Sequence, residues 1–193
     1  MAALSFDAVL FDCDGVLVDS EPITNRVLTE MLGELGWQLT VEETMRIFVG
    51  KAVKDEMGLI EEKTGFRLTQ DWLATFWARR NEALERELTA IPGAVEAVRA
   101  LHAQLDGRIA CASGADRGKV ELQLARVGLL DAFEGRIFSG HETPRSKPYP
   151  DVYLAAARAL DVDPTRCAVV EDTVTGASAG IGAGAAVFGY SPR

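Results

Sequence analysis

The chain has 193 residues, of which 48% are hydrophobic and 25% charged, as in an ordinary water-soluble globular protein. Its formal net charge of −9 at pH 7 argues against a surface for nucleic acid or anionic membrane, because both need an excess of Lys and Arg. The charge does not exclude a site for a small phosphorylated molecule. No stretch of the sequence approaches the roughly 20 apolar residues that cross a membrane.

The N-terminus and the cysteines bear on the cellular compartment. The stretch MAALSFDAVLFDCD lacks a basic region, and its apolar run is too short for a signal peptide. Cys13, Cys111 and Cys167 are odd in number and lie in strand-like runs, which fits buried, reduced thiols better than disulfides. We therefore expect a cytoplasmic protein, and we expect it to be a monomer or a weak homodimer.

Short apolar runs predict strands at Ala8–Phe11, Ile109–Ala112, Arg136–Phe138, Cys167–Val170 and Ala186–Phe188. These runs show little polar alternation, which is typical of parallel strands buried on both faces. Helical patterns over residues 94–105, around 116–127 and over 151–160 separate the later runs. Alternating strands and helices predict an α/β fold, with a Rossmann-like parallel sheet core flanked by helices.

One region breaks the alternation. Between about Pro22 and Leu88 there is no convincing strand run, and apolar residues recur at helical spacing. A block of about 65 residues is far longer than an ordinary connection between a strand and a helix. We interpret residues 19–88 as an inserted all-helical cap domain, and residues 1–18 and 89–193 as the Rossmann-like core.

Acidic residues follow two of the predicted strands. In AVLFDCDGVLVDSE, Asp12 and Asp14 come directly after the first run, and Glu171 and Asp172 follow the run at Cys167–Val170. Ligands of open α/β sheets gather beyond the carboxyl ends of the strands. Neighbouring carboxylates repel one another unless a cation relieves the repulsion, and Mg²⁺ is a natural oxygen-binding partner. The alternative is that each carboxylate caps a helix or is a solvated strand end.

Two further segments could bind an anion. Ser113 and Gly114 follow a predicted strand and precede a helix that begins near Asp116, where a hydroxyl and backbone N–H groups can hold a phosphate. Lys147 lies in the proline-rich loop PRSKPYPD, which would present its ammonium group at a fixed point. The alternatives are a capping serine and a solvated lysine.

Together these segments resemble the haloacid dehalogenase-like phosphohydrolases, in the branch with a helical cap after the first strand. Four motifs carry the resemblance in order: FDCDGVLVDSE at 11–21, CASG at 111–114, SKPYPD at 146–151 and VVEDTVTG at 169–176. The resemblance covers almost the whole chain and implies a Mg²⁺-dependent enzyme that acts on a small phosphorylated metabolite.

The resemblance also implies residue roles. Asp12 would attack phosphorus to form an aspartyl-phosphate, and Asp14 would protonate the leaving alcohol and then activate water. The predicted metal-site residues are Asp12, Asp14 through its backbone carbonyl, and Asp172, with Glu171 nearby. The predicted phosphate-binding residues are Ser113, Gly114 and Lys147.

The presence of Asp14 favours phosphoryl chemistry with an alcohol or sugar leaving group, so we expect a phosphatase for a sugar or sugar-acid phosphate. One alternative is a mutase like β-phosphoglucomutase. Those mutases carry a histidine ten residues after the second aspartate, where this chain has Thr24, and a cap arginine where this chain has Val53. A remote alternative is a receiver-like signalling domain phosphorylated at Asp12, but receivers lack a helical insertion of this size.

Substrate choice is expected to rest with the cap. Gly50 and Lys51, in FVGKAVKD, are the candidate cap loop for substrate contact, and a solvated helix end is the alternative. Members of this family typically continue through a further helix and strand after the last run, whereas this sequence stops at Arg193.

Overall fold

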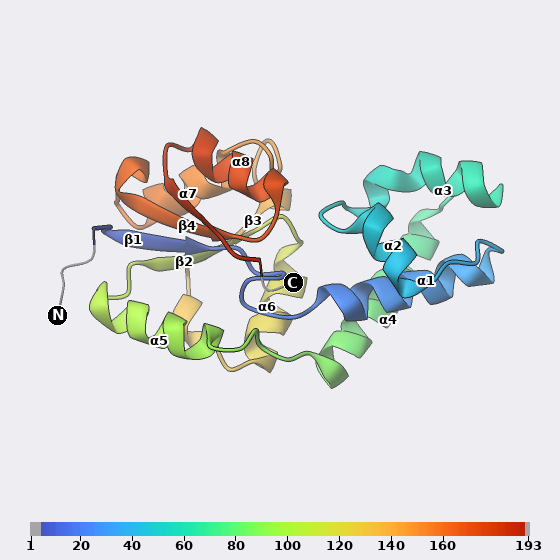
Figure 1. Ribbon diagram of the computed structural model, residues 1–193, viewed down its shortest axis with the longest axis horizontal. Helices are drawn as coiled ribbons and strands as arrows, with labels where there is room; N and C mark the ends of the chain where they lie inside the picture. The colour runs from blue at the N-terminus through green and yellow to red at the C-terminus, as the bar shows by residue number, and fades with distance from the viewer. Residues whose placement is uncertain (1–4, 192–193) are drawn as a thin grey trace. The chain divides into compact units, whose positions relative to one another are not determined.

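The computed structural model describes residues 5–191 and contains one parallel sheet of five strands (Figure 1). The strand order is β3-β2-β1-β4-β5. The strands are β1 (Ala8–Phe11), β2 (Ile109–Ser113), β3 (Ile137–Ser139), β4 (Cys167–Glu171) and β5 (Ala186–Gly189). The predicted α/β fold with a parallel sheet is confirmed, and each observed strand begins and ends within one residue of its predicted run.

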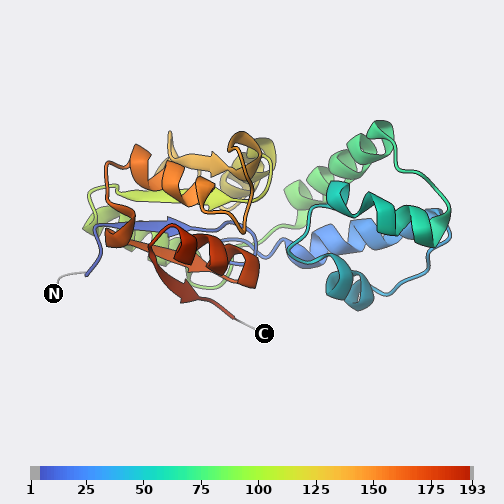
Figure 2. The ribbon, with the colours of Figure 1, turned by 90° about the horizontal axis from the view of Figure 1, so that it is seen from above.

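The chain divides into two compact units, one formed by the segments up to Val18 and from Thr89 onward, the other by Asp19–Leu88. In the first unit, helices α5 and α6 cover one face of the sheet, and α7 and α8 cover the other (Figures 1 and 2). Their bounds are α5 (Ala94–Gln104), α6 (Arg117–Arg126), α7 (Asp151–Ala159) and α8 (Val174–Gly182). Short 3-10 helices lie at Asp131–Phe133, Gly140–Glu142 and Pro164–Arg166.

Among the α-helices described in this unit, the sequence analysis did not predict α8. Its sequence, VTGASAGIG, is rich in glycine, which disfavours a helix in isolation. The glycines are needed because the helix lies very close to the sheet. A Cβ on Gly180 would come within 2.8 Å of Val187 and 3.1 Å of Val169. Close packing on the sheet therefore stabilises a helix whose local propensity is low.

The second unit is helical throughout. It contains α1 (Glu21–Glu34), α2 (Val41–Phe48), a 3-10 helix (Val53–Glu56), α3 (Met57–Thr64) and α4 (Gln70–Glu87). The structure describes all of residues 19–88, and no strand lies among them. The unit has its own apolar core, in which the buried residues include Leu28, Met31, Leu32, Ile60, Leu73 and Phe76.

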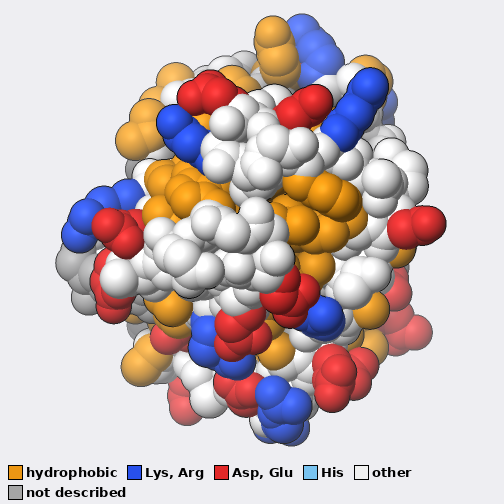
Figure 3. All heavy atoms as spheres, turned by 90° about the vertical axis from the view of Figure 1, so that its right-hand side faces the viewer, with side chains coloured by type: hydrophobic (Ala, Val, Ile, Leu, Met, Phe, Trp, Pro, Cys, Tyr) orange, Lys and Arg blue, Asp and Glu red, His pale blue; other side chains and the backbone are white. Residues whose placement is uncertain are grey.

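Acidic and basic side chains are interspersed over the face shown in Figure 3, with hydrophobic side chains exposed between them and no continuous basic surface on that face. Among residues 5–191, no helix is both long enough and apolar enough to span a bilayer.

Candidate active site

The site is built where β1 and β4 end side by side. Asp12 follows β1 directly, and its backbone N–H donates to the carbonyl of Val170 at 3.0 Å, which extends the pairing of the two strands. Glu171 is the last residue of β4, and Asp172 follows it. One carboxylate oxygen from each of Asp12, Glu171 and Asp172 lies within 4.8 Å of the other two. The parallel register therefore gathers acidic residues that are far apart in the sequence.

A tight turn after β1 makes room for Asp172. The backbone N–H of Gly15 donates to the carbonyl of Val18 at 2.9 Å, and Gly15 has a φ of +76°. A Cβ at this position would lie 2.0 Å from Oδ2 of Asp172. Only glycine combines this left-handed conformation with so close an approach. Gly15 thus lets the turn pass directly beside a carboxylate.

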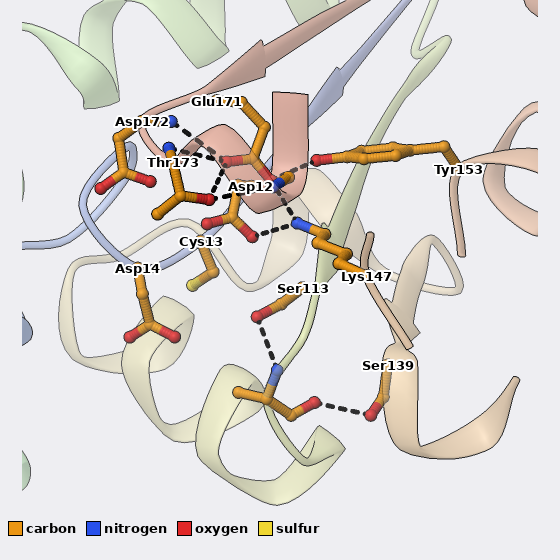
Figure 4. A network of polar contacts seen from close by, with 12 residues as sticks. Asp12, Cys13, Asp14, Ser113, Ser139, Lys147, Tyr153, Glu171, Asp172 and Thr173 are labelled. Atoms are coloured by element: carbon orange, nitrogen blue, oxygen red, sulfur yellow. Dashed lines mark hydrogen bonds and ion pairs between the residues drawn. The ribbon is translucent and has the colours of Figure 1, made fainter. Parts of the chain in front are cut away.

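Lys147 links Asp12 to Glu171. Its Nζ donates to Oδ1 of Asp12 at 2.7 Å and to Oε1 of Glu171 at 2.6 Å (Figure 4). The lysine side chain is only 8% exposed. Burial by itself lowers the pKa of Lys147, but the two carboxylates outweigh burial and the pKa is raised. Lys147 is therefore a fixed positive charge beside Asp12.

Hydrogen bonds occupy both carboxylate oxygens of Glu171. Besides Lys147, Oε1 accepts from the hydroxyl of Tyr153 at 2.7 Å. Oε2 accepts from the backbone N–H groups of Asp172 and Thr173 and from the Thr173 hydroxyl (Figure 4). A Cβ on Gly176 would lie 1.7 Å from Oε1, so α8 also packs tightly against this carboxylate. Glu171 is thus held rigidly and in turn holds Lys147.

Asp172 differs from Glu171 in having an unused oxygen. Its Oδ1 is buried and has no hydrogen-bond partner among residues 5–191. Burial and then the charge of Glu171 raise the pKa of Asp172 to about 6. Burial likewise raises the pKa of Asp12 to about 7, despite the opposing charge of Lys147. Such a group fits a divalent cation, which would satisfy the unpartnered oxygen and relieve the repulsion.

Asp14 has a different environment from Asp12. Its side chain extends away from Lys147 and Glu171 (Figure 4). Oδ1 of Asp14 accepts from Nζ of Lys119 and from Nε2 of Gln123, each at 2.8 Å. Its carboxylate does not belong to the group formed by Asp12, Glu171 and Asp172 within the described part of the chain. Two carboxylates two residues apart thus have separate partners and can perform separate tasks.

Ser113 and Gly114 lie at the end of β2, the strand next to β1. The Ser113 hydroxyl accepts from the backbone N–H of Ala115 at 3.1 Å, so it holds the turn before α6 but does not cap that helix. Ser139 in turn donates to the Ala115 carbonyl at 2.6 Å (Figure 4). Helix α6 begins at Arg117, after its N-cap Asp116, as predicted. Ser113 still has its proton to donate, and its binding of phosphate stays a prediction.

The two predicted cap residues lie in the turn after α2 of the helical unit. Gly50 has a φ of +76°, and Nζ of Lys51 lies 3.5 Å from a carboxylate oxygen of Glu56. The Lys51 side chain is 48% exposed. This environment matches a solvated helix end, and a substrate role for the loop stays a prediction.

Sequence reasoning missed the residues that surround the aspartates: Lys119, Gln123, Tyr153 and Thr173. A signal for two of them was available. Lys119 and Gln123 are four residues apart and directly precede Val120 and Leu124, so they lie on the side of the helix that packs against the sheet. Polar residues at such positions suggest a buried polar partner.

The chain matches the haloacid dehalogenase-like hydrolase family over residues 6–184. It is 33% identical over 183 residues to 6-phosphogluconate phosphatase of Escherichia coli strain K12, covering 94% of this chain and 81% of the relative. It is 30% identical over 171 residues to hexitol phosphatase B of the same strain, covering 88% of this chain and 76% of the relative.

A solved structure of a protein from this family is also similar to the chain. A haloacid dehalogenase family hydrolase from Deinococcus radiodurans R1, crystallised with bound phosphate and sodium, superimposes with a TM-score of 0.77 at 39% identity. The match covers 97% of this chain and 81% of that one. The family resemblance and the expectation of an enzyme are thereby confirmed.

Proposed function

The chain belongs to the haloacid dehalogenase-like hydrolases, and we propose that it is a Mg²⁺-dependent phosphatase of a sugar or sugar-acid phosphate that works through an aspartyl-phosphate. The observation that carries the proposal is the arrangement around Asp12. One side has the buried cation of Lys147 at 2.7 Å, and the other has the unpartnered oxygen of Asp172. A nucleophile, a fixed cation and a metal-binding group therefore meet at one point.

In the first step a carboxylate oxygen of Asp12 attacks phosphorus. The bond from phosphorus to the leaving oxygen breaks, and that oxygen takes a proton from the carboxyl group of Asp14. Lys147, with Ser113 and the backbone N–H of Gly114, stabilises the negative charge on the phosphoryl oxygens as it redistributes. The product is a free alcohol and a phosphorylated Asp12.

In the second step Asp14 acts as a base. It takes a proton from a water molecule, which attacks the phosphoryl group and breaks its bond to Asp12. Inorganic phosphate leaves, and Asp14 is again protonated for the next substrate. The separate partners of Asp12 and Asp14 in the structure support this division of roles.

The metal-site residues of the proposal are Asp12, Asp172 and the backbone carbonyl of Asp14, with Glu171 nearby. A bound Mg²⁺ would neutralise phosphate charge and orient the phosphoryl group for attack. The saturated hydrogen bonds of Glu171 favour a supporting role for that residue, and the unpartnered oxygen of Asp172 favours a direct one.

The names of the relatives direct the choice of substrate. The Escherichia coli relatives are named 6-phosphogluconate phosphatase and hexitol phosphatase B, which supports a small, hydroxylated phosphate ester as substrate. We propose that the helical unit selects among such esters through the loop at Gly50 and Lys51.

The test is phosphate release from a panel of sugar and sugar-acid phosphates that begins with 6-phosphogluconate, with Mg²⁺ and with EDTA. Asp12→Asn and Asp14→Asn serve as matched controls, and Lys51→Met tests the cap loop through the order of preference among substrates. Release by the wild type alone, dependent on Mg²⁺, is the expected result. Glucose 6-phosphate formed from β-glucose 1-phosphate would instead show a mutase, and stable phosphorylation of Asp12 without release would show a receiver.

The remaining proposals concern partners and location. The net charge of −9 supports a protein without nucleic-acid or membrane partners. Cys13, Cys111 and Cys167 are buried and unpaired, which supports a reducing compartment such as the cytoplasm. A monomer or weak homodimer is proposed, and size-exclusion chromatography with light scattering would test it.

A further inference from the structure

Two buried polar side chains of α6 converge on Asp14. Lys119 donates to Oδ1 of this carboxylate through Nζ and Gln123 through Nε2, each at 2.8 Å. Lys119 is 7% exposed and Gln123 is fully buried. Lysine is rarely buried unless it is paired, because the loss of hydration must be compensated. The contact therefore belongs to the packed interior of the protein, unlike the solvent-exposed ion pairs on its surface.

The surroundings fix the direction of both donors. Asp116 caps α6 by accepting from the backbone N–H of Lys119 at 2.9 Å, which sets where the helix begins. The thiol of Cys13 lies 3.4 Å from Oε1 of Gln123 and donates to it. That bond orients the amide so that its NH₂ group faces Asp14. A residue next to the nucleophile thus orients a group that holds the proposed acid.

Resting on the proposed function, we infer that Lys119 and Gln123 are positioning residues for proton transfer by Asp14. By holding Oδ1 they fix the rotation of the carboxyl group, and so the place at which its proton passes to the leaving oxygen when the P–O ester bond breaks. A general acid must lie within hydrogen-bond reach of that oxygen. A displacement of about 1 Å can lower a rate about a hundredfold.

This role can be separated from a purely structural or electrostatic one by the leaving group. Phenyl phosphate and p-nitrophenyl phosphate are similar in size, but p-nitrophenolate leaves readily as an anion and needs little help from an acid. The value of kcat/KM reports on the steps up to and including formation of the aspartyl-phosphate. The general acid acts during that formation. Loss of positioning should therefore affect phenyl phosphate far more than p-nitrophenyl phosphate.

The experiment measures kcat/KM for both aryl phosphates with Mg²⁺ in the wild type, Lys119→Met and Gln123→Met. We expect a fall of about tenfold to a hundredfold with phenyl phosphate and a change within about threefold with p-nitrophenyl phosphate. Asp14→Asn should show the same dependence on the leaving group with a larger loss. Lys119→Arg, which keeps the charge and the donors, should recover part of the activity.

The controls distinguish the possible failures. Lys63→Met makes the same exchange at an exposed lysine of α3 and should change neither value. Equal losses with both substrates, or no loss, would overturn the positioning role while leaving the phosphatase proposal intact. A wild type inactive on both aryl phosphates and on the panel of sugar and sugar-acid phosphates would overturn both. If Lys119→Met does not fold by circular dichroism, Gln123→Met decides the question alone.

Discussion

Two ion pairs in different regions of this protein have similar geometry and opposite surroundings. At the ends of β1 and β4, Lys147 lies 2.7 Å from Asp12, and the two side chains are 8% and 10% exposed. On the surface of the helical unit, Arg79 lies 2.5 Å from Glu34, and the side chains are 46% and 54% exposed. Distance alone would rank the surface pair as the stronger of the two.

The two pairs differ far more in burial than in distance, and we expect burial to decide which pair matters to stability and activity. A buried ion loses its hydration, so removing its partner leaves an uncompensated charge. An exposed pair keeps much of its hydration and is screened by salt. Buried, closely paired charges such as those around Lys147 are typical of sites at which a reaction uses them.

The largest effect is expected at Asp12, the proposed nucleophile. Asp12→Asn removes the attacking carboxylate and should lower kcat for the preferred phosphate ester by at least about ten-thousandfold. The fold should persist, because Lys147 keeps Glu171 as a partner. Phosphate release and circular dichroism measure the two parts of this prediction. Retention of more than about a hundredth of the activity in a folded variant would contradict the role of Asp12.

Removing the cation should affect both activity and stability. Lys147→Met should lower kcat about a hundredfold to a thousandfold and the free energy of unfolding by about 3–5 kcal/mol. In the double variant Lys147→Met/Glu171→Gln, one of the uncompensated carboxylates is gone, so we expect stability to recover in part while activity stays low. Chemical denaturation and phosphate release would show this split. Parallel recovery of both properties would mean that Lys147 has only a structural role.

Magnesium should stabilise the protein in a pH-dependent way. In the metal-free protein the pKa values of Asp12 and Asp172 are raised from 3.8 to about 7 and about 6. The folded state therefore holds protons that the unfolded chain has lost, and the stability from this source falls as pH rises from about 4 to about 7. Mg²⁺ needs the deprotonated carboxylates, so its effect should grow over the same range.

The measurement is the change in unfolding temperature on adding Mg²⁺, at about pH 5 and about pH 8. A concentration of about a hundred times the dissociation constant should add about 2.7 kcal/mol at the higher pH, and much less at the lower one. Asp172→Asn should abolish most of the increase. An equal effect of Mg²⁺ at both pH values would show that the ion binds away from Asp12 and Asp172.

Much of the sheet could be predicted from the sequence, because strands buried on both faces leave short, uninterrupted apolar runs. The gathering of Asp12, Glu171 and Asp172 follows from parallel strands that end at one edge of the sheet. The motifs indicate these residues from the sequence alone, the structure brings their carboxylates together, and their roles stay predictions.

The features that the sequence did not predict depend on contacts between segments that are far apart in the chain. Helix α8 has low intrinsic propensity, and its close approach to β4 and β5 depends on the small residues at Gly176 and Gly180. The bond from Tyr153 to Glu171 joins α7 to β4. Lys119 reaches Asp14 across 105 positions of sequence. Such partners are chosen by tertiary packing, and local periodicity alone cannot identify them.

The smallest effect is expected at the surface pair of Arg79 and Glu34. This pair tests whether a short distance without burial contributes to stability. Glu34→Gln removes the negative charge that contacts Arg79 while keeping the shape of the side chain. The hydrogen bond to Glu34 raises the pKa of Arg79, and the short distance would suggest a strong interaction. Because both side chains are about half exposed, water and salt screen them.

We therefore expect the unfolding temperature of Glu34→Gln to stay within about 2 °C of the wild type, with kcat unchanged. The same exchange at Glu171 is the matched comparison. Glu171→Gln removes the charge of a buried partner of Lys147, so it should lower both the unfolding temperature and kcat. Thermal unfolding in low and high salt completes the test, since any contribution of the Glu34 pair should shrink with salt. A loss of stability at Glu34 equal to that at Glu171 would show that distance outweighs burial in this protein.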